Sequence, residues 1–397
     1  MYFRHAFAGL VATIVFAASL ASAQTPTPVP TLPVPQPQST PTPSAPSVPA
    51  KSYVLMDFAS GRILAEKNGN ERLEPASLTK MMSSYVVFEE IAAGRLGRDD
   101  QVTISEKAWK TGGSKMFIEV GKQVSVNDLL RGMIIQSGND ATVALAEQVA
   151  GSEDVFAQMM NAAAAKLGME NTHFVNSDGL PAEGHVSSAL DMARLSRAMI
   201  ADHPGDYATY AEKTFEWNGI TQHNRNALLW RDDSVDGIKT GHTESAGYCL
   251  AASAKRDDMR LIAVVMGTDS EKARADAAQA LLNYGFRFFE SHTLYQPDAE
   301  LATPTVWKGA AETLALGVAE PVVVTVPRGR YSDLKASMDL PKQIVAPIQQ
   351  GQQVGTLKVS LDGETLVERP LLAQQAVEEA GFFGRLNDSF WMWWQGD

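Results

Sequence analysis

Three short groups of polar residues carry side chains suited to acyl-transfer chemistry. They are Ser77-Leu78-Thr79-Lys80, Ser137-Gly138-Asn139 and Lys239-Thr240-Gly241. A serine hydroxyl is a weak nucleophile until a neighbouring base takes its proton, and a lysine that loses its own proton on burial is such a base. The order S-x-x-K, S-x-N, K-T-G along one chain therefore predicts nucleophilic catalysis by a serine activated by a lysine.

The setting of Ser77 supports this role. It follows Pro75-Ala76 and is expected to open a helix, where the helix dipole and the free amides favour developing negative charge. Lys80 comes three residues later, so both side chains are expected on one helical face.

Three other segments also match these motifs, but they lack such a setting. Ser332-Asp333-Leu334-Lys335 falls in a β-rich stretch, and Lys110-Thr111-Gly112 is interpreted as loop. Ser125-Val126-Asn127 has a structural explanation, because Ser125 is expected to cap a helix with Asp128 at the capping-box position.

The other two motifs are expected to face one cleft. Ser137-Gly138-Asn139 is predicted in a break between two helices, where it could relay a proton and hold a substrate amide, and Asp140 is interpreted as a helix-start residue. Lys239-Thr240-Gly241 precedes a strand hairpin, which predicts a sheet edge that an extended peptide could join. There the lysine charge and the threonine hydroxyl would meet a carboxylate, and Gly241 would let the substrate backbone approach.

The surrounding periodicity predicts an α+β fold. Apolar alternation indicates a strand pair at residues 52–58 and 62–66, and a helical pattern extends over residues 75–210. A second hairpin follows at residues 247–254 and 260–267, and then a helix at 281–290. This order indicates an antiparallel sheet flanked by helices, with a helical lobe, and chemistry where the lobes meet.

The C-terminal part has a different amino-acid composition. Runs of β-branched residues at 322–326 and 354–361, with a turn at Asp362-Gly363, predict a smaller all-β domain with a spacer or docking role. Residues 381–397 place Phe and Trp on one side of a helical wheel, which predicts an amphipathic helix lying on a membrane surface. The alternative is a terminal helix docked on its own domain.

The N-terminus predicts secretion. An apolar stretch at residues 6–20 precedes Ala21-Ser22-Ala23, which is typical of a signal peptide cleaved after Ala23, although an uncleaved anchor is the alternative. Residues 24–50 hold ten prolines and are expected to form an extended, disordered linker. Cys249 has no cysteine to pair with and is interpreted as a small buried hydrophobe.

Length and net charge limit the number of domains and the class of partner. The 397 residues suggest two domains plus tails, and a net charge of −12 argues against nucleic acid as a partner. We expect a signal peptide at residues 1–23, a linker at 24–50, a catalytic domain at 51–291, a β-rich domain at 292–375 and an anchor helix at 376–397.

With these motifs in view, the sequence resembles the low-molecular-mass penicillin-binding proteins of the serine-type D-alanyl-D-alanine carboxypeptidase family. The resemblance extends from about Lys51 to the C-terminus and includes residues 73–80, 131–144, 171–174, 178–180, 222–230, 235–243 and 284–290. It implies a penicillin-binding or β-lactamase-like fold, a peptidoglycan stem peptide ending in D-Ala-D-Ala as substrate, and no metal or other cofactor. It also implies a periplasmic enzyme held on the outer face of the inner membrane.

The resemblance further implies a role for each site residue. Ser77 would be the nucleophile that β-lactams also acylate, with Lys80 as its base. Ser137 would relay a proton to the leaving amine and Asn139 would clamp a substrate amide. The remaining substrate-binding residues would be Lys239, Thr240, Gly241 and Arg225 around the terminal carboxylate, and the backbone amides of Ser77 and His242 as oxyanion hole. The side chains of His242 and His185 fit a surface or packing role equally well.

Two alternative functions are compatible with the fold. A β-lactamase would need a loop carboxylate to activate the deacylating water, and Glu183 is the candidate in residues 181–184, where the chain departs from the family pattern. A non-catalytic penicillin-binding scaffold would have no need of a base beside a serine, so the three intact motifs argue against it.

Overall fold

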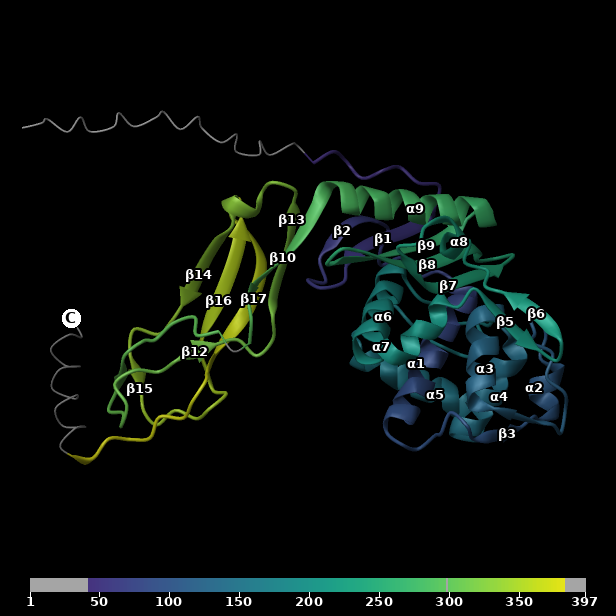
Figure 1. Ribbon diagram of the computed structural model, residues 1–397, viewed down its shortest axis with the longest axis horizontal. Helices are drawn as coiled ribbons and strands as arrows, with labels where there is room; N and C mark the ends of the chain where they lie inside the picture. The colour runs from purple at the N-terminus through teal and green to yellow at the C-terminus, as the bar shows by residue number, and fades with distance from the viewer. Residues whose placement is uncertain (1–41, 298, 383–397) are drawn as a thin grey trace, which may run out of the picture. The chain divides into compact units, whose positions relative to one another are not determined.

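The computed structural model describes residues 42–297 and 299–382, and they form an α+β domain followed by a β-rich domain (Figure 1). The helices of the first domain are η1 (Ala76–Leu78), α1 (Thr79–Ala92), α2 (Glu106–Lys110), α3 (Val126–Arg131), η2 (Gly132–Gln136), α4 (Asn139–Ala150), α5 (Glu153–Lys166), α6 (Ala189–Asp202), α7 (Pro204–Tyr207), η3 (Ala208–Ala211), α8 (Leu228–Arg231) and α9 (Glu271–Phe288). Its strands are β1 (Ser52–Asp57), β2 (Ile63–Lys67), β3 (Gln101–Thr103), β4 (Gln123–Ser125), β5 (Thr214–Trp217), β6 (Ile220–His223), β7 (Val235–Thr243), β8 (Gly247–Arg256) and β9 (Met259–Thr268).

The regular elements of the second domain are almost all strands. They are β10 (Phe289–Tyr295), β11 (Val306–Trp307), β12 (Leu316–Gly317), β13 (Val322–Pro327), β14 (Lys335–Asp339), β15 (Ile344–Val345), β16 (Gln353–Leu361) and β17 (Glu364–Ala373), with one short helix, η4 (Tyr331–Asp333). The predicted turn between β16 and β17 is confirmed, with Asp362 and Gly363 at φ values of 52° and 88°. The predicted fold class is therefore confirmed for both domains.

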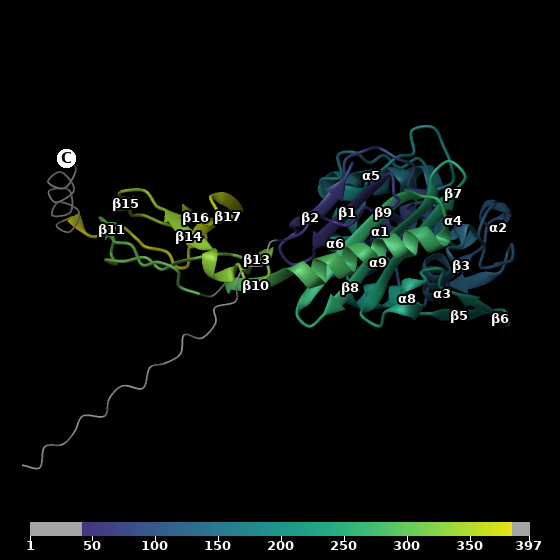
Figure 2. The same cartoon turned by 90° about the horizontal axis from the view of Figure 1, so that it is seen from above.

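One antiparallel sheet in the order β2-β1-β9-β8-β7 organises the first domain. Every residue of β1 is buried, because alternate side chains enter two different cores. Val54 and Met56 pack in the core that includes α1 and α6, whereas Leu55 packs in the core under α9. Figure 2 shows α9 lying across the sheet. The strand that carries the K-T-G motif, β7, is an edge of this sheet, as the sequence predicted.

The packed structure begins before the predicted start at Lys51. Val48 and Ala50 are buried in the core under α9, and the Tyr284 hydroxyl donates a hydrogen bond to the carbonyl of Pro43 at 2.9 Å. A Pro-rich segment cannot build a core of its own, but it can lie extended on an existing one. The prediction of a disordered linker is therefore wrong for residues 42–50.

Two further boundaries differ from the expected ones. The helix expected at residues 281–290 begins at Glu271, because the Ser270 side chain accepts a hydrogen bond from the Ala273 amide and caps it. It ends at Phe288, where β10 begins, so the boundary expected after residue 291 falls inside a strand.

Most of the residues to which the predictions for the two termini apply are not described by the structure. The signal peptide and most of the linker, and residues 383–397 of the expected anchor helix, lie outside the described residues. The helix prediction is wrong for residues 376–381, because they are not helical and Val377 and Glu379 form β-bridges with Ile348 and Gly309 of the β-rich domain. Across residues 42–297 and 299–382, the structure contains no helix with the length and apolar character needed to cross a bilayer.

A buried histidine fastens a loop to the first turn of α1. The Nδ1 atom of His185 accepts a hydrogen bond from the Val175 amide at 3.0 Å, and its Nε2 atom lies 2.8 Å from the Thr79 hydroxyl. Because Nδ1 accepts, the ring is neutral with its proton on Nε2. Burial lowers the pKa of His185 to about 4. His185 therefore has a packing role.

This histidine predicts acid sensitivity of the fold. In the unfolded chain the pKa returns to about 6.5, so the stabilisation is complete above that pH and is lost as pH falls from 6.5 towards 4. Between pH 7.5 and pH 5, wild type should lose about 2 kcal/mol more unfolding free energy than His185→Gln. Urea unfolding at both pH values measures this difference, and equal losses in the two proteins would contradict the assignment.

Candidate active site

Ser77 and Lys80 meet at the start of α1. Ser77 lies in η1, which leads directly into α1, and Ala76 before it has a φ of 47°. The Lys80 Nζ atom is 3.1 Å from Ser77 Oγ, and Lys80 has no exposed surface. The structure thus brings the predicted nucleophile and base together at hydrogen-bonding distance.

Two further oxygen atoms surround the Lys80 amine. Its Nζ atom donates to Asn139 Oδ1 at 2.7 Å and to the carbonyl oxygen of Asp178 at 2.5 Å. The orientation of the Asn139 amide follows from its other end, because Nδ2 donates to the Gly112 carbonyl at 2.7 Å. Both oxygens can only accept. A neutral amine that donates its two hydrogens to them has its lone pair left for Ser77.

The pKa of Lys80 fits such a neutral state. Burial, helped by the charge of Arg225 and opposed by the charges of Asp178 and Asp140, lowers it from 10.5 to about 8. About a tenth of Lys80 is therefore uncharged at pH 7 and can take a proton from a neighbouring hydroxyl.

The second lysine is paired with the second serine. Ser137 links η2 to α4 with a φ of 66°, and its Oγ accepts a hydrogen bond from Lys239 Nζ at 2.9 Å. Lys239 also donates to the Thr240 carbonyl at 3.1 Å and is 3% exposed. Burial, followed by the charge of Lys80, lowers the pKa of Lys239 well below its usual value. Ser137 and Lys239 therefore form one unit.

These groups border a cavity of about 200 Å³. Its lining residues are Ser77, Ser114, Ser137, Arg225, Thr240, Gly241, His242, Tyr248, Glu271 and Arg274. Gly241 packs tightly against the nucleophile turn, since a Cβ there would come within 3.0 Å of the Pro75 carbonyl and 3.2 Å of the Ser77 amide. The K-T-G strand can approach Ser77 this closely because residue 241 has no side chain.

Arg225 reaches the cavity from a fixed turn. The Asn224 side chain accepts from the Asn226 amide at 3.0 Å, and Asn226 Nδ2 donates to the Gly237 carbonyl on β7 at 2.9 Å. Both asparagines are buried, whereas Arg225 between them is exposed. The N-R-N pattern therefore secures the backbone and presents one guanidinium to the cavity.

Sequence reasoning misses two components of the site. Arg274 on α9 is 3% exposed and donates to the Gly241 carbonyl at 3.1 Å, which adds a cation behind the K-T-G strand. The expected helix begins only at residue 281, so no pattern points to Arg274. The second component is the loop that follows Lys110. The sequence assigns this loop no role, because its match to K-T-G lacks the expected setting. In the structure, however, the Gly112 carbonyl accepts a hydrogen bond from the Asn139 side chain, and Ser114 lines the cavity.

The surroundings of Asn139, His242 and Glu183 bear on the roles expected for them. Both ends of the Asn139 amide are engaged by Lys80 and Gly112, so in the free enzyme it positions Lys80, which differs from the substrate clamp that the resemblance implied. His242 is exposed and stacks on Tyr248 with ring centroids 4.0 Å apart. Glu183 is also exposed, which weakens the β-lactamase alternative.

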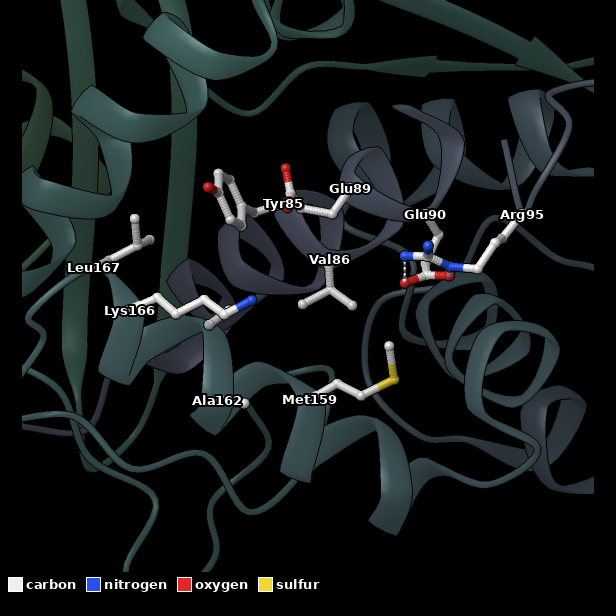
Figure 3. Close-up of a pocket in the computed structure, with 10 residues that line it drawn as sticks. Tyr85, Val86, Glu89, Glu90, Arg95, Met159, Ala162, Lys166 and Leu167 are labelled. Atoms are coloured by element: carbon white, nitrogen blue, oxygen red, sulfur yellow. Dashed lines mark hydrogen bonds and ion pairs between the residues drawn. The ribbon is translucent and has the colours of Figure 1, made fainter. Parts of the chain in front are cut away.

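The helical lobe contains another pocket of about 260 Å³ between α1 and α5 (Figure 3). None of its ten lining residues is a serine, threonine or cysteine, and its Glu90 and Arg95 form an ion pair at 2.6 Å. Of these two cavities, therefore, only the Ser77 cavity is lined by a serine with a lysine base beside it.

Comparisons with known proteins agree with this site. A family model described as D-alanyl-D-alanine carboxypeptidase matches residues 39–270, and one described as penicillin-binding protein 5, C-terminal domain, matches residues 289–379. The chain is 49% identical to the D-alanyl-D-alanine carboxypeptidase DacC of Escherichia coli strain K12 over 352 residues, which cover 87% of this chain and 88% of that protein. It is 39% identical to DacF of Bacillus subtilis strain 168, with coverage of 87% and 90%.

Solved structures give the same result. Penicillin-binding protein 5 from Haemophilus influenzae superposes with a TM-score of 0.82 at 42% identity, covering 85% of this chain and 99% of that one. Penicillin-binding protein D2 from Listeria monocytogenes in the ampicillin-bound form has a TM-score of 0.56 at 30% identity, covering 60% of this chain and 98% of that one. The chain therefore belongs to the D-alanyl-D-alanine carboxypeptidase family of low-molecular-mass penicillin-binding proteins.

Proposed function

We propose that Ser77, Lys80, Ser137 and Lys239 carry out a serine-type D-Ala-D-Ala carboxypeptidase reaction that releases the terminal D-alanine of peptidoglycan pentapeptides. The single observation that carries this assignment is the 3.1 Å contact between Ser77 Oγ and the buried Lys80 amine. Family membership supports the reaction, and the geometry supports the roles of the individual residues.

The first step is acylation. The neutral Lys80 amine takes the hydroxyl proton of Ser77 while Oγ attacks the carbonyl of the penultimate D-alanine. Negative charge develops on the carbonyl oxygen, and the backbone amides of Ser77 and His242 are the proposed donors that stabilise it. Gly241 supports this placement, because its close contact with the Ser77 turn brings β7 alongside the nucleophile.

The second part of the reaction is departure of D-alanine. The peptide nitrogen must gain a proton before its bond to the carbonyl carbon breaks, and the Ser137 hydroxyl, which is hydrogen-bonded to Lys239, can deliver one. The proton that Lys80 took from Ser77 is passed on to Ser137, which restores the Ser137 hydroxyl and leaves the Lys80 amine neutral again. Water then attacks the ester on Ser77 and gives a proton to Lys80, which transfers it to the departing Ser77 oxygen. The tetrapeptide leaves with a new carboxyl group, and Ser77 regains its hydrogen.

The terminal carboxylate of the substrate is the feature that distinguishes a carboxypeptidase from an endopeptidase. Thr240, Arg225 and Arg274 line the cavity, and the Lys239 amine contacts Ser137 at its border. The free edge of β7 can hold the substrate backbone by main-chain hydrogen bonds. A free carboxylate in this cationic setting gains charge-assisted hydrogen bonds that a continuing peptide chain would lack.

β-Lactams are proposed to acylate the same serine. Penicillin-binding protein D2 from Listeria monocytogenes, which shares this fold, has been solved in an ampicillin-bound form. A β-lactam carries a strained amide and a carboxylate at the positions of the scissile bond and of the D-alanine carboxylate.

We also propose that the chain works in the periplasm, peripherally attached to the outer face of the inner membrane through residues 381–397.

Substitution of Ser77 tests the enzyme assignment. Ser77→Ala should abolish release of D-alanine from diacetyl-Lys-D-Ala-D-Ala, with a loss of at least about 10³-fold, because no hydroxyl is left to form the acyl-enzyme. Intact mass should also show no penicilloyl adduct. The matched control is Ser332→Ala in the imitation S-x-x-K motif, which should retain both properties. D-Alanine release by Ser77→Ala at the wild-type rate would refute the proposal.

A charge placed beside Lys80 tests its role as the base. In Asn139→Asp a carboxylate replaces the amide oxygen 2.7 Å from Nζ, so the pKa of Lys80 should rise. The pH profile of penicillin acylation should then move by about one to three units towards alkaline pH. Asn127→Asp is the control, because Asn127 belongs to the imitation S-x-N motif and contacts Arg98 instead. An unshifted profile in Asn139→Asp would rule out Lys80 as the titrating base.

A further inference from the structure

The two edges of the four-stranded sheet in the β-rich domain differ. The strand order is β12-β17-β16-β14, so β12 and β14 form the edges (Figure 1). At the β12 edge, Leu316 is buried, and its amide donates a hydrogen bond to the Ala302 carbonyl at 2.9 Å. At the other edge, β14 pairs only with β16 among the described residues, and all five residues of β14 are exposed. The β12 edge is therefore covered by neighbouring chain, whereas the β14 edge is open.

The backbone of β14 is regular enough to accept a further strand. Its pairing with β16 runs from Lys335 to Asp339 without a register shift, and these five residues include no proline. Bulges and prolines are among the features by which exposed edge strands avoid pairing. A regular edge strand instead presents a row of amide and carbonyl groups to the backbone of another strand. The open edge of β14 can therefore extend the sheet.

The charges of β14 are placed symmetrically about its centre. Successive side chains point to opposite faces of a strand, so Lys335, Ser337 and Asp339 share one face. Neither Lys335 nor Asp339 forms an ion pair within the described part of the chain. Charged side chains usually keep a second strand away from an edge. In two β14 strands paired antiparallel about Ser337, however, each Lys335 would lie opposite Asp339 of the other copy, and the charges would attract.

The opposite face of β14 fits the same pairing. Met338 is paired with Leu357 of β16, which is fully buried in the core of this domain. Ala336 is paired with Val359, which is also fully buried in that core. Because paired residues share a face of the sheet, the apolar face extends to Met338, which is 36% exposed. In the antiparallel arrangement Ala336 of each copy would lie opposite Met338 of the other, so pairing would also shield apolar surface.

We propose that the open edge of β14 is a self-association surface, to which a second copy of this chain adds its own β14 in antiparallel orientation with Ser337 at the two-fold axis. A two-fold dimer needs a patch that is complementary to itself, because the same residues meet from both copies. The segment Lys335-Ala336-Ser337-Met338-Asp339 meets this condition on both faces. A parallel pairing would instead place like charges side by side. The dimer joins two four-stranded sheets into one continuous sheet.

Charge exchange tests this pairing. The purified wild-type chain should show a concentration-dependent equilibrium between monomer and dimer in sedimentation. Lys335→Asp places an aspartate opposite Asp339 of the second copy, and Asp339→Lys places a lysine opposite Lys335. Each variant alone should therefore dimerise about tenfold more weakly than the wild type. An equimolar mixture of the two variants again brings opposite charges together at both positions, so the mixture should associate as the wild type does.

The mixture also controls for folding, because a variant that had lost its fold could not restore association. Lys342→Asp is the matched control for net charge, since Lys342 is exposed but lies outside β14, and it should dimerise as the wild type does. A wild-type chain that stays monomeric up to about 1 mM would overturn the inference and leave the edge to a strand of another protein. Dimers that neither exchange weakens, or a mixture that associates no better than its components, would overturn it as well.

Discussion

The chemistry of this protein depends on one buried amine with three oxygen neighbours. Lys80 Nζ lies 3.1 Å from Ser77 Oγ, 2.7 Å from Asn139 Oδ1 and 2.5 Å from the Asp178 carbonyl. The last two can only accept hydrogens, so the uncharged amine has its lone pair directed at the serine. The three neighbours come from η1, from the start of α4 and from the loop that His185 fastens to α1. The fold therefore has to assemble three separate segments before the serine becomes a nucleophile.

A local concentration of positive charge contrasts with the acidic chain as a whole. The net charge is −12, yet Lys80, Lys239, Arg225 and Arg274 gather around one small cavity. Burial lowers the pKa of both lysines, and neighbouring cations add to the shift: Arg225 for Lys80, and Lys80, Arg225 and Arg274 for Lys239. The same cations attract a carboxylate. Burial and this cluster of cations together account for the lowered pKa of the proposed base, and the cluster supports the proposed binding of a free chain end.

The sequence is sufficient to predict the parts of the site that are local in the chain. The spacing of Ser77 and Lys80, the break at Ser137 and the edge strand with Lys239 all follow from periodicity and motif context. The contacts of Asn139 with Gly112, and of Arg274 with Gly241, join segments far apart in sequence, and no local pattern encodes them. Composition also misleads, because a Pro-rich segment predicts a free linker although its Val48 and Ala50 supply apolar surface that packs on a neighbouring core.

The central claim is that the pKa of Lys80 is lowered to about 8, so that about a tenth of the free enzyme at pH 7 holds Lys80 uncharged. Titration of its side-chain nitrogen by NMR, with Lys80→Arg to assign the signal, measures this directly. The structure predicts a midpoint near pH 8, since burial lowers the pKa of Lys80 to about 8. A midpoint at the ordinary lysine value of about 10.4 would contradict the account, because an ammonium ion has no lone pair with which to deprotonate Ser77.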